Sequence, residues 1–160
     1  MASYDLRFRP FRATDAPRLE RWLQGAGMPL PESLPRQVWA QRIAGGDARI
    51  QALTAMAGRV AIGFLRLDLA PDRSAELTLI VDPRHRRRGI GRLLVEKALE
   101  EARRLGLRRL SALVRPDNEP ALRLFTETGF EPSATRVVGF ECLARVVHRA
   151  DRERPLEIVP

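Results

Sequence analysis

Residues 76–106, ELTLIVDPRHRRRGIGRLLVEKALEEARRLG, give the strongest indication of the fold. The stretch opens with an apolar, β-branched run that ends at Asp82-Pro83, which is typical of a strand followed by a turn. After Gly89 the apolar residues recur every three or four positions, the spacing of one buried helix face. The stretch therefore predicts a strand over 76–81, a tight turn, and an amphipathic helix that ends at Gly106.

The turn Arg86-Arg87-Arg88-Gly89-Ile90-Gly91 is the candidate anion site. A strand that passes into a helix here presents unpaired backbone N–H groups at the positive end of the helix dipole. Gly89 and Gly91 are expected to accept positive φ and to admit a diphosphate close to the backbone, while the arginines grip phosphate oxygens. Taken alone, a glycine pair at such a junction is equally compatible with a plain tight turn. A dinucleotide-binding Rossmann unit fits less well because it needs a glycine at Arg87.

Outward from this stretch, alternation and turn residues predict the other elements. Further strands are expected around 6–10, 48–56, 60–69, 110–114, 134–140 and 142–148, with a hairpin turn at Ala57-Gly58-Arg59. Further helices are expected after an N-cap at Thr14-Asp15, around Val38 to Ile43, and between Asp117-Asn118 and Gly129. The chain is interpreted as one domain over residues 1–150, followed by a frayed tail over 151–160.

Composition indicates an ordinary soluble protein. The chain has 160 residues, 44% of them hydrophobic and 30% charged, which suits a single globular core. The most apolar region, 52–70, is interrupted by Arg59, Arg66 and Asp68, so no membrane span is predicted. No secretion signal opens the sequence, and a cytoplasmic location is expected. With one cysteine and two histidines, neither a disulfide nor a metal site is predicted.

The net charge of +8 raises the question of nucleic-acid binding. Lys97 is the only lysine among 28 basic residues, which indicates a chain-wide preference for arginine rather than a selected basic patch. One tyrosine and two tryptophans are too few for a base-stacking surface. A basic nucleic-acid adaptor is therefore the least favoured hypothesis for this chain.

Two motifs together resemble the GNAT superfamily of N-acetyltransferases. Arg86, Gly89 and Gly91 match the family's Arg/Gln-x-x-Gly-x-Gly/Ala coenzyme A loop. Its Asn-x-x-Ala-x-x-x-aromatic-x-x-x-Gly-Phe helix is matched by Asn118, Ala121, Phe125, Gly129 and Phe130. The close resemblance covers residues 76–130 and implies an α/β (α+β) fold, a central twisted mixed sheet with helices on both faces. In this fold the strands at 76–81 and 108–114 splay apart.

The resemblance implies that acetyl-CoA lies in this gap as the acyl donor, without a metal. The strand backbone would bond the pantetheine arm, the turn amides the pyrophosphate, and Asn118 the pantetheine or the leaving thiol. The simpler alternatives are an N-cap role for Asn118 and a buried strand at 79–81. The coenzyme-binding residues implied in this way are Leu79, Ile80, Val81, Arg86, Arg87, Arg88, Gly89, Ile90, Gly91, Arg92, Asn118 and Phe125.

Glu76 is the candidate catalytic residue. An alkylamine with a pKa of ~10.4 is almost entirely protonated at neutral pH, so acetyl transfer needs a base. The family often has a glutamate in this strand, while its other location for a base falls at Leu113, which cannot serve. Because side chains alternate along a strand, a bulge or a shift of one residue would turn Glu76 to the opposite face.

The position of Phe125 departs from the family, which often has a tyrosine there to protonate the leaving thiolate.

The first hypothesis is an N-acetyltransferase that acts on a primary amine of a small molecule, amino sugar, amino acid or protein N-terminus. The alternative is a catalytically silent module that binds acyl-CoA. The resemblance also implies a homodimer. Acceptor specificity is expected from segments 25–35, 70–75 and 139–141, which carry Glu32, Asp72 and Glu141.

Overall fold

The computed structural model describes residues 5–26, 48–86 and 88–147. In that part of the chain one seven-stranded sheet has the order β1-β2-β3-β4-β5-β7-β6, and only the β4–β5 pair is parallel. The strands are β1 (Leu6–Pro10), β2 (Ile50–Ala57), β3 (Val60–Leu69), β4 (Ser74–Val81), β5 (Arg109–Val114), β6 (Glu131–Pro132) and β7 (Glu141–Val146). The helices are α1 (Ala16–Ala26), α3 (Ile90–Leu105) and α4 (Glu119–Glu127), with short 3₁₀ turns at Ala13–Asp15 and Pro83–His85.

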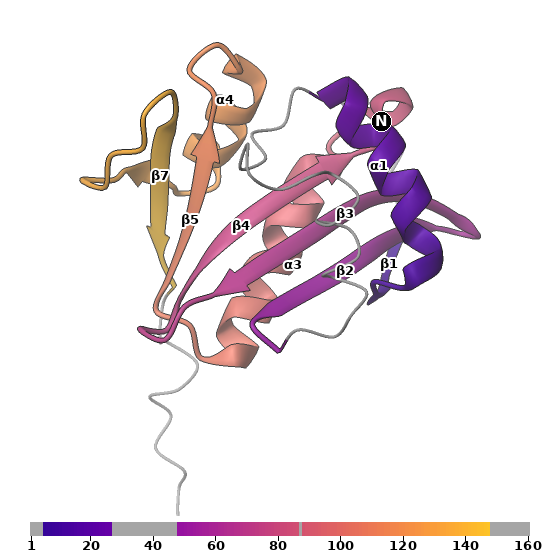
Figure 1. The fold of residues 1–160 in the computed structure, drawn as a ribbon, viewed down its shortest axis with the longest axis horizontal. Coiled ribbons are helices and arrows are strands. Elements are labelled where there is room, and N and C mark those ends of the chain that lie inside the picture. Colours follow the sequence, from indigo (N-terminus) through magenta and orange to yellow (C-terminus); the bar gives the residue numbers. More distant parts are fainter. Residues whose placement is uncertain (1–4, 27–47, 87, 148–160) are drawn as a thin grey trace, which may run out of the picture.

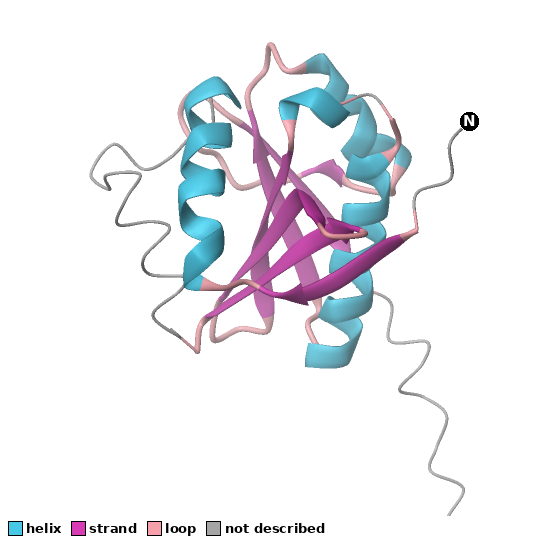
Figure 2. Ribbon diagram, turned by 90° about the vertical axis from the view of Figure 1, so that its right-hand side faces the viewer, coloured by secondary structure: helices cyan, strands magenta, loops and turns pink. Residues whose placement is uncertain are grey.

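Helices cover both faces of the sheet, as Figures 1 and 2 show. The apolar face of α3 packs on one side and forms the larger core with inward-facing strand residues and Phe125 of α4. On the other side, Leu19 and Leu23 of α1 pack against Phe64 and Ile80. Burial of these apolar side chains is the main force that holds the layers together. The predicted twisted mixed sheet with helices on both faces is confirmed.

Strand β4 leaves its parallel neighbour after a short contact. It pairs with β3 without a break, from Ala75 opposite Leu69 to Val81 opposite Gly63. Its pairing with β5 covers Ser74 to Glu76 only. Beyond Glu76 the two strands diverge, which is visible between the magenta and orange arrows of Figure 1. This is the predicted gap between the two strands.

The prediction of a strand over 134–140 is wrong. The sixth strand is earlier and shorter, and its residues Glu131 and Pro132 pair with Ala144 and Leu143 of β7. The chain then forms a loop in which Val138 is 99% exposed and Gly139 has a φ of 84°. Only an isolated bridge between Val137 and Phe140 forms here, and no neighbouring strand in the described part of the chain pairs with this loop. The expected helix around Val38 to Ile43, the loop with Glu32, and the tail over 151–160 lie outside the described residues.

Asp15 has a different role from the predicted cap of α1. Its carboxylate accepts hydrogen bonds from the Arg12 N–H at 2.8 Å and the Thr54 hydroxyl at 2.9 Å. Arg9 donates two more, at 2.7 and 2.8 Å. The side chain therefore closes the 3₁₀ turn that precedes α1 and joins it to β1 and β2. The sequence predicted only a local cap. The partners on the two strands could not be foreseen, because the sheet brings them to Asp15 from elsewhere in the chain.

Candidate active site

The turn before α3 has the geometry of an anion site at a helix N-terminus. Gly89 is the N-cap, with φ of 78° and ψ of 4°, and it has no side chain to cap the first amides. Arg86 and Arg88 are exposed beside it, while Arg87 lies outside the described residues. Because α3 is 16 residues long, its first turn offers amide donors at the positive end of a full helix dipole.

Gly91 serves packing rather than a special backbone conformation. It lies inside α3, and the expectation of positive φ is confirmed for Gly89 only. A Cβ on Gly91 would lie 2.9 Å from Cδ2 of Leu124 on α4. The missing side chain thus lets α4 approach the start of α3, which carries the turn.

Replacing Gly91 with alanine tests this packing. In wild type we expect little net change, since a gain of about 1 kcal/mol in helix propensity is offset by the overlap with Leu124. In a Leu124→Ala background the overlap is gone, and Gly91→Ala should stabilise the protein by about 1 kcal/mol. Urea unfolding of the four proteins in this cycle measures the coupling. Strictly additive effects would contradict the contact.

The residues of β4 beyond Glu76 have buried or half-buried side chains and an open edge. Ile80 packs into the α1-side core, while Leu79 and Val81 pack against the α3-side core. On the side toward β5 no strand pairs with these residues within the described ranges. Their side chains therefore belong to the cores, as the simpler alternative expected, and only their main chain is available to a ligand that adds along the strand.

The remaining predicted coenzyme residues already have structural roles. The side-chain oxygen of Asn118 accepts a hydrogen bond from the Ala121 N–H at 3.3 Å, so the N-cap interpretation holds. Phe125 is buried and meets Phe130 edge to face, with 5.0 Å between ring centres. Arg92 forms an exposed ion pair with Glu127 at 3.3 Å. Coenzyme contact by these three residues stays a prediction.

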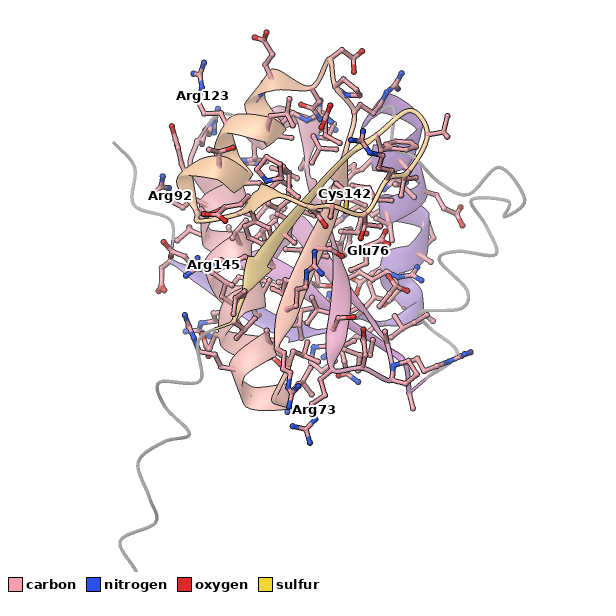
Figure 3. The ribbon with its side chains drawn as sticks, turned by 90° about the vertical axis from the view of Figure 1, so that its left-hand side faces the viewer. Arg73, Glu76, Arg92, Arg123, Cys142 and Arg145 are labelled. Atoms are coloured by element: carbon pink, nitrogen blue, oxygen red, sulfur yellow. The ribbon has the colours of Figure 1, made fainter. Side chains whose placement is uncertain are left out.

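Glu76 faces the same side of the sheet as α1. The pairing of β4 with β3 has no bulge, and the neighbouring Ala75 and Leu77 belong to the core on the α3 side. Glu76 lies opposite Asp68 of β3 and Ser111 of β5, at the last residue before the strands separate. Figure 3 shows it beside the β5–β7 strands, with α1 on the same side. The alternative orientation is thereby excluded.

The carboxyl of Glu76 has a raised pKa. The side chain reaches solvent, but the surrounding protein atoms partly desolvate the carboxyl group and so raise its pKa. The negative charge of Asp68 raises the pKa further, whereas the positive charge of Arg66 lowers it. Desolvation disfavours the charged form of a carboxyl group, and so does a like charge nearby. Such a shift is common among groups that exchange protons in active sites.

Sequence reasoning missed Arg66 and Asp68, which surround Glu76 from β3. Arg66 is buried, and its Nε and Nη2 donate to the two oxygens of Asp68 at 2.9 and 2.7 Å. In the sequence they only interrupted an apolar run. The available signal was their spacing of two residues within a predicted strand, which places both on one face.

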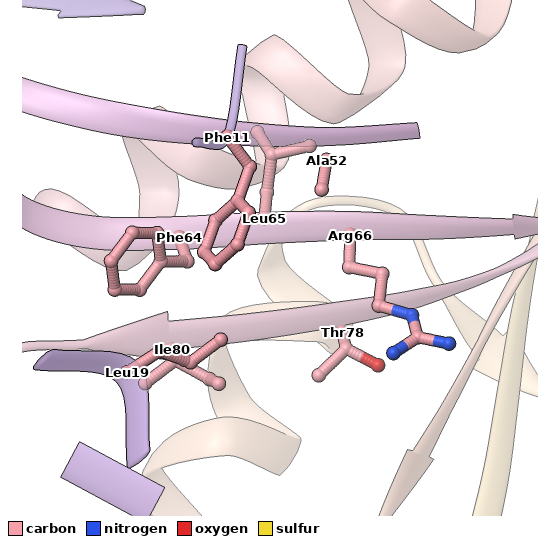
Figure 4. A pocket seen from close by; sticks show the side chains of 8 residues that line it. All are labelled: Phe11, Leu19, Ala52, Phe64, Leu65, Arg66, Thr78 and Ile80. Carbon is pink, nitrogen blue, oxygen red and sulfur yellow. The ribbon is translucent and has the colours of Figure 1, made fainter. Parts of the chain in front are cut away.

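A small, largely apolar pocket lies next to this cluster on the α1 side. Figure 4 shows the rings of Phe11 and Phe64 at one end, and Arg66 with Thr78 at the other. The two rings meet edge to face, with 5.4 Å between their centres. The pocket is lined by Phe11, Leu19, Ala52, Phe64, Leu65, Arg66, Thr78 and Ile80.

Of the expected acceptor carboxylates, Asp72 and Glu141 can be placed. Asp72 accepts hydrogen bonds from the N–H and hydroxyl of Ser74 and so stabilises the turn before β4. Glu141 is exposed at the start of β7. Within the described residues no group of three or more His, Cys, Asp or Glu side chains is arranged to hold a metal ion. None of the helices in that part of the chain is long and apolar enough to cross a membrane.

A mixed sheet that opens between two parallel strands, with a helix N-terminus beyond the open end, is the fold expected from the sequence resemblance, and a solved N-acetyltransferase shares the overall fold. The chain belongs to the Acetyltransferase (GNAT) family, whose model matches residues 16–130. That match covers both sequence motifs and the strand with Glu76.

Known relatives agree with this assignment. Over 61 residues the chain is 38% identical to a Bacillus subtilis (strain 168) protein named "Putative phosphinothricin acetyltransferase YwnH". That alignment spans 38% of this chain and 37% of the relative, so the chain covers just over a third of that protein's length. Two solved structures share the fold, as follows.

The PaiA N-acetyltransferase of Thermoplasma acidophilum in complex with coenzyme A has a TM-score of 0.74 at 19% identity, with 89% of this chain and 99% of that chain covered. The spermidine N-acetyltransferase of Vibrio cholerae in complex with CoA and spermine has a TM-score of 0.75 at 18% identity, with 89% and 95% covered.

Proposed function

We propose that the protein is an acetyl-CoA-dependent N-acetyltransferase that acts on a primary amine, with Glu76 as the general base. The observation that carries the proposal is the position of Glu76, a carboxyl with raised pKa at the point where β4 and β5 separate. A base must remove a proton from an ammonium before its nitrogen can attack. A carboxylate whose pKa is raised toward the working pH is better suited to that task than an ordinary one.

The residues on the donor side fit coenzyme A. Phosphate oxygens are bound by amides at a helix N-terminus, and the first turn of α3 after Gly89 offers such amides beside Arg86 and Arg88. A pantetheine arm carries amide groups, which suit the open main-chain edge of β4 at Leu79 to Val81. Bound acetyl-CoA supplies the activated acetyl group as a thioester.

The reaction follows from these positions. The ammonium gives a proton to Glu76, directly or through a water. The neutral nitrogen forms a bond with the thioester carbonyl carbon and gives up a second proton to solvent, and the carbon–sulfur bond breaks as the amide forms. The sulfur leaves with the electron pair and takes a proton from solvent, because a thiol with a pKa of about 8.5 is a tolerable leaving group near neutral pH. Phe125, in the core, donates no proton.

Phe125 also favours the second candidate, a silent module that binds acyl-CoA. Release of free thiol from acetyl-CoA across a panel of amines distinguishes the two functions. Amine-dependent thiol release supports the enzyme, and mass spectrometry of the product should show one added acetyl group. Coenzyme binding by calorimetry, combined with no thiol release from any amine, would favour the silent module.

The double variant Arg86→Ala/Gly89→Ala tests the donor site. We expect about a tenfold loss of coenzyme A affinity, because one phosphate-binding arginine is lost and the turn amides are displaced when alanine resists positive φ. Calorimetric titration with coenzyme A measures this. Arg103→Ala, which removes an exposed arginine from the other end of α3, is the control and should bind normally. Equal affinity of the double variant and wild type would contradict the placement of the pyrophosphate.

The homodimer and the single domain over residues 1–150 stay predictions. One solved relative, the spermidine N-acetyltransferase of Vibrio cholerae, is described as dodecameric. Light scattering of this protein in solution measures its own assembly, and limited proteolysis tests the domain boundary near residue 150.

A further inference from the structure

The charged side chains around Glu76 differ in how far they are buried. Asp68 lies directly across from Glu76 on the adjacent strand, so both carboxylates are on the α1 face. The side chain of Arg66 is 9% exposed, whereas that of Asp68 is 39% exposed and Glu76 reaches solvent. The cation of the cluster is thus buried beneath two outward carboxylates, and a ligand arriving from solvent meets negative charge first.

Arg66 binds Asp68 through one edge of its guanidinium group. Its Nε and Nη2 form the paired arrangement with both oxygens of Asp68. The planar fork of an arginine recognises one carboxylate in this way, and here that carboxylate is part of the protein. Arg66 therefore holds Asp68 in place, and the three charges sum to −1 when both carboxyls are ionised.

The apolar pocket extends from this cluster. Arg66 and Thr78 line its polar end, and Phe11 and Phe64 line the other. The pocket itself is about 10 Å³, room for a single water molecule, so the apolar surface beside the carboxylates, and not the pocket, can contact the body of a ligand. Ligand sites of this kind combine a mostly apolar lining with a few polar groups that set the orientation.

We propose that Asp68 determines acceptor specificity: Asp68 and Glu76 together receive the acceptor as an alkyl- or arylalkylammonium and reject amines whose adjacent carbon carries a carboxylate. The inference rests on the proposed function and adds the substrate class. Glu76 takes the proton, while Asp68 attracts the cation and repels the carboxylate of an amino acid. The opposite arrangement, with Arg66 as the receptor of an acceptor carboxylate, is disfavoured because its Nε–Nη2 edge already binds Asp68 and its side chain is only 9% exposed.

Matched amine pairs test the proposal in the wild-type protein. Phenethylamine and phenylalanine differ only by the carboxylate next to the amine. Ornithine likewise differs from putrescine by a carboxylate next to one of its two amines. We expect kcat/KM to favour the amine by about tenfold or more in each pair, because like charges repel in a partly desolvated site. Equal or better acetylation of phenylalanine, or of ornithine at its α-amine as located by mass spectrometry, would overturn the proposal.

The variant Asp68→Asn should reduce that preference to a few-fold, chiefly by weakening the amines, whereas a merely structural role would lower both members of a pair alike. Glu100→Gln, an exposed change on α3, is the control and should keep the wild-type ratio. Circular dichroism checks that Asp68→Asn is folded. An unchanged ratio in folded Asp68→Asn would overturn the role of Asp68.

A binding measurement separates this inference from the proposed function. In NMR titrations we expect phenethylammonium or putrescine, but not 3-phenylpropionate, to shift resonances near Glu76. If the cations bind and no amine releases thiol, the proposed reaction fails and the acceptor class stands. If thiol release is observed but the carboxylate binds, or neither cation binds, the inference fails.

Discussion

Replacing Glu76 with glutamine is expected to lower kcat by about 100-fold or more, since general bases typically contribute 10²- to 10⁴-fold. Glutamine keeps the size and one hydrogen-bond acceptor but cannot take a proton. The base acts after the coenzyme is bound, so the affinity for coenzyme A should not change. Steady-state thiol release and calorimetric titration measure the two quantities separately.

Stability should respond to this change differently from activity. The folded-state pKa of Glu76 is raised, mainly by partial desolvation and then by Asp68, with Arg66 opposing. A raised carboxyl pKa means that folding disfavours the charged form, so this group lowers stability as pH rises through its folded-state pKa. Glu76→Gln should therefore unfold at the same temperature as wild type, or at a slightly higher one, at neutral pH.

The pH profile provides the third readout. For wild type, the acidic limb of kcat/KM should fall at a pH above the ordinary range of a glutamate, because the base works only when ionised. In Glu76→Gln this limb should disappear. Glu131→Gln, an exposed change on β6, is the matched control and should leave both rate and profile unchanged. A Glu76→Gln protein with wild-type kcat would show that another group is the base.

Replacing Asp15 with alanine is expected to lower the free energy of unfolding by about 3 kcal/mol, because removal of one partner leaves a partly buried charge without compensation. The change breaks hydrogen bonds to Arg9, to the Arg12 N–H and to Thr54 together. The Arg9 side chain is 24% exposed, so water compensates for part of the loss. Urea unfolding followed by circular dichroism measures the effect.

The pH dependence of stability identifies the ionised form of Asp15. Burial by itself raises the pKa of this carboxyl, but the hydrogen bonds from Arg9, Arg12 and Thr54 outweigh it and hold the pKa below its usual value. A carboxyl group with a lowered folded-state pKa stabilises the protein above the unfolded-state pKa, near 4. This stabilisation is lost as pH falls through the folded-state pKa.

Asp15→Asn should therefore flatten the acid side of the stability curve. Asp5→Asn, at an exposed position close in sequence, should keep the wild-type slope. If Asp15→Ala unfolds at the wild-type urea concentration, the junction of β1, β2 and the turn before α1 does not depend on this carboxylate.

Local sequence signals predicted most of the elements around the candidate site. The strand-like apolar runs over 60–69 and 76–81 and the helical period after Gly89 correspond to β3, β4 and α3. These signals work because periods of two and of 3.6 residues are local properties of strands and helices. The strand expected over 134–140 failed for the same reason, since local residue types do not reveal whether a neighbouring strand is present to pair with them.

The turn at 86–91 and the helix motif at 118–130 were enough to predict the family from the sequence, and the strand before the turn gave Glu76 as the candidate base. The face that Glu76 takes, and the presence of Asp68 and Arg66 beside it, became visible only in the folded chain. The tertiary structure also showed that Phe125 is buried against Phe130 and that Asp15 joins three elements. The physical reason is that the sheet register brings together side chains that are distant in the chain, and a register is fixed by the burial of whole strand faces rather than by adjacent residues.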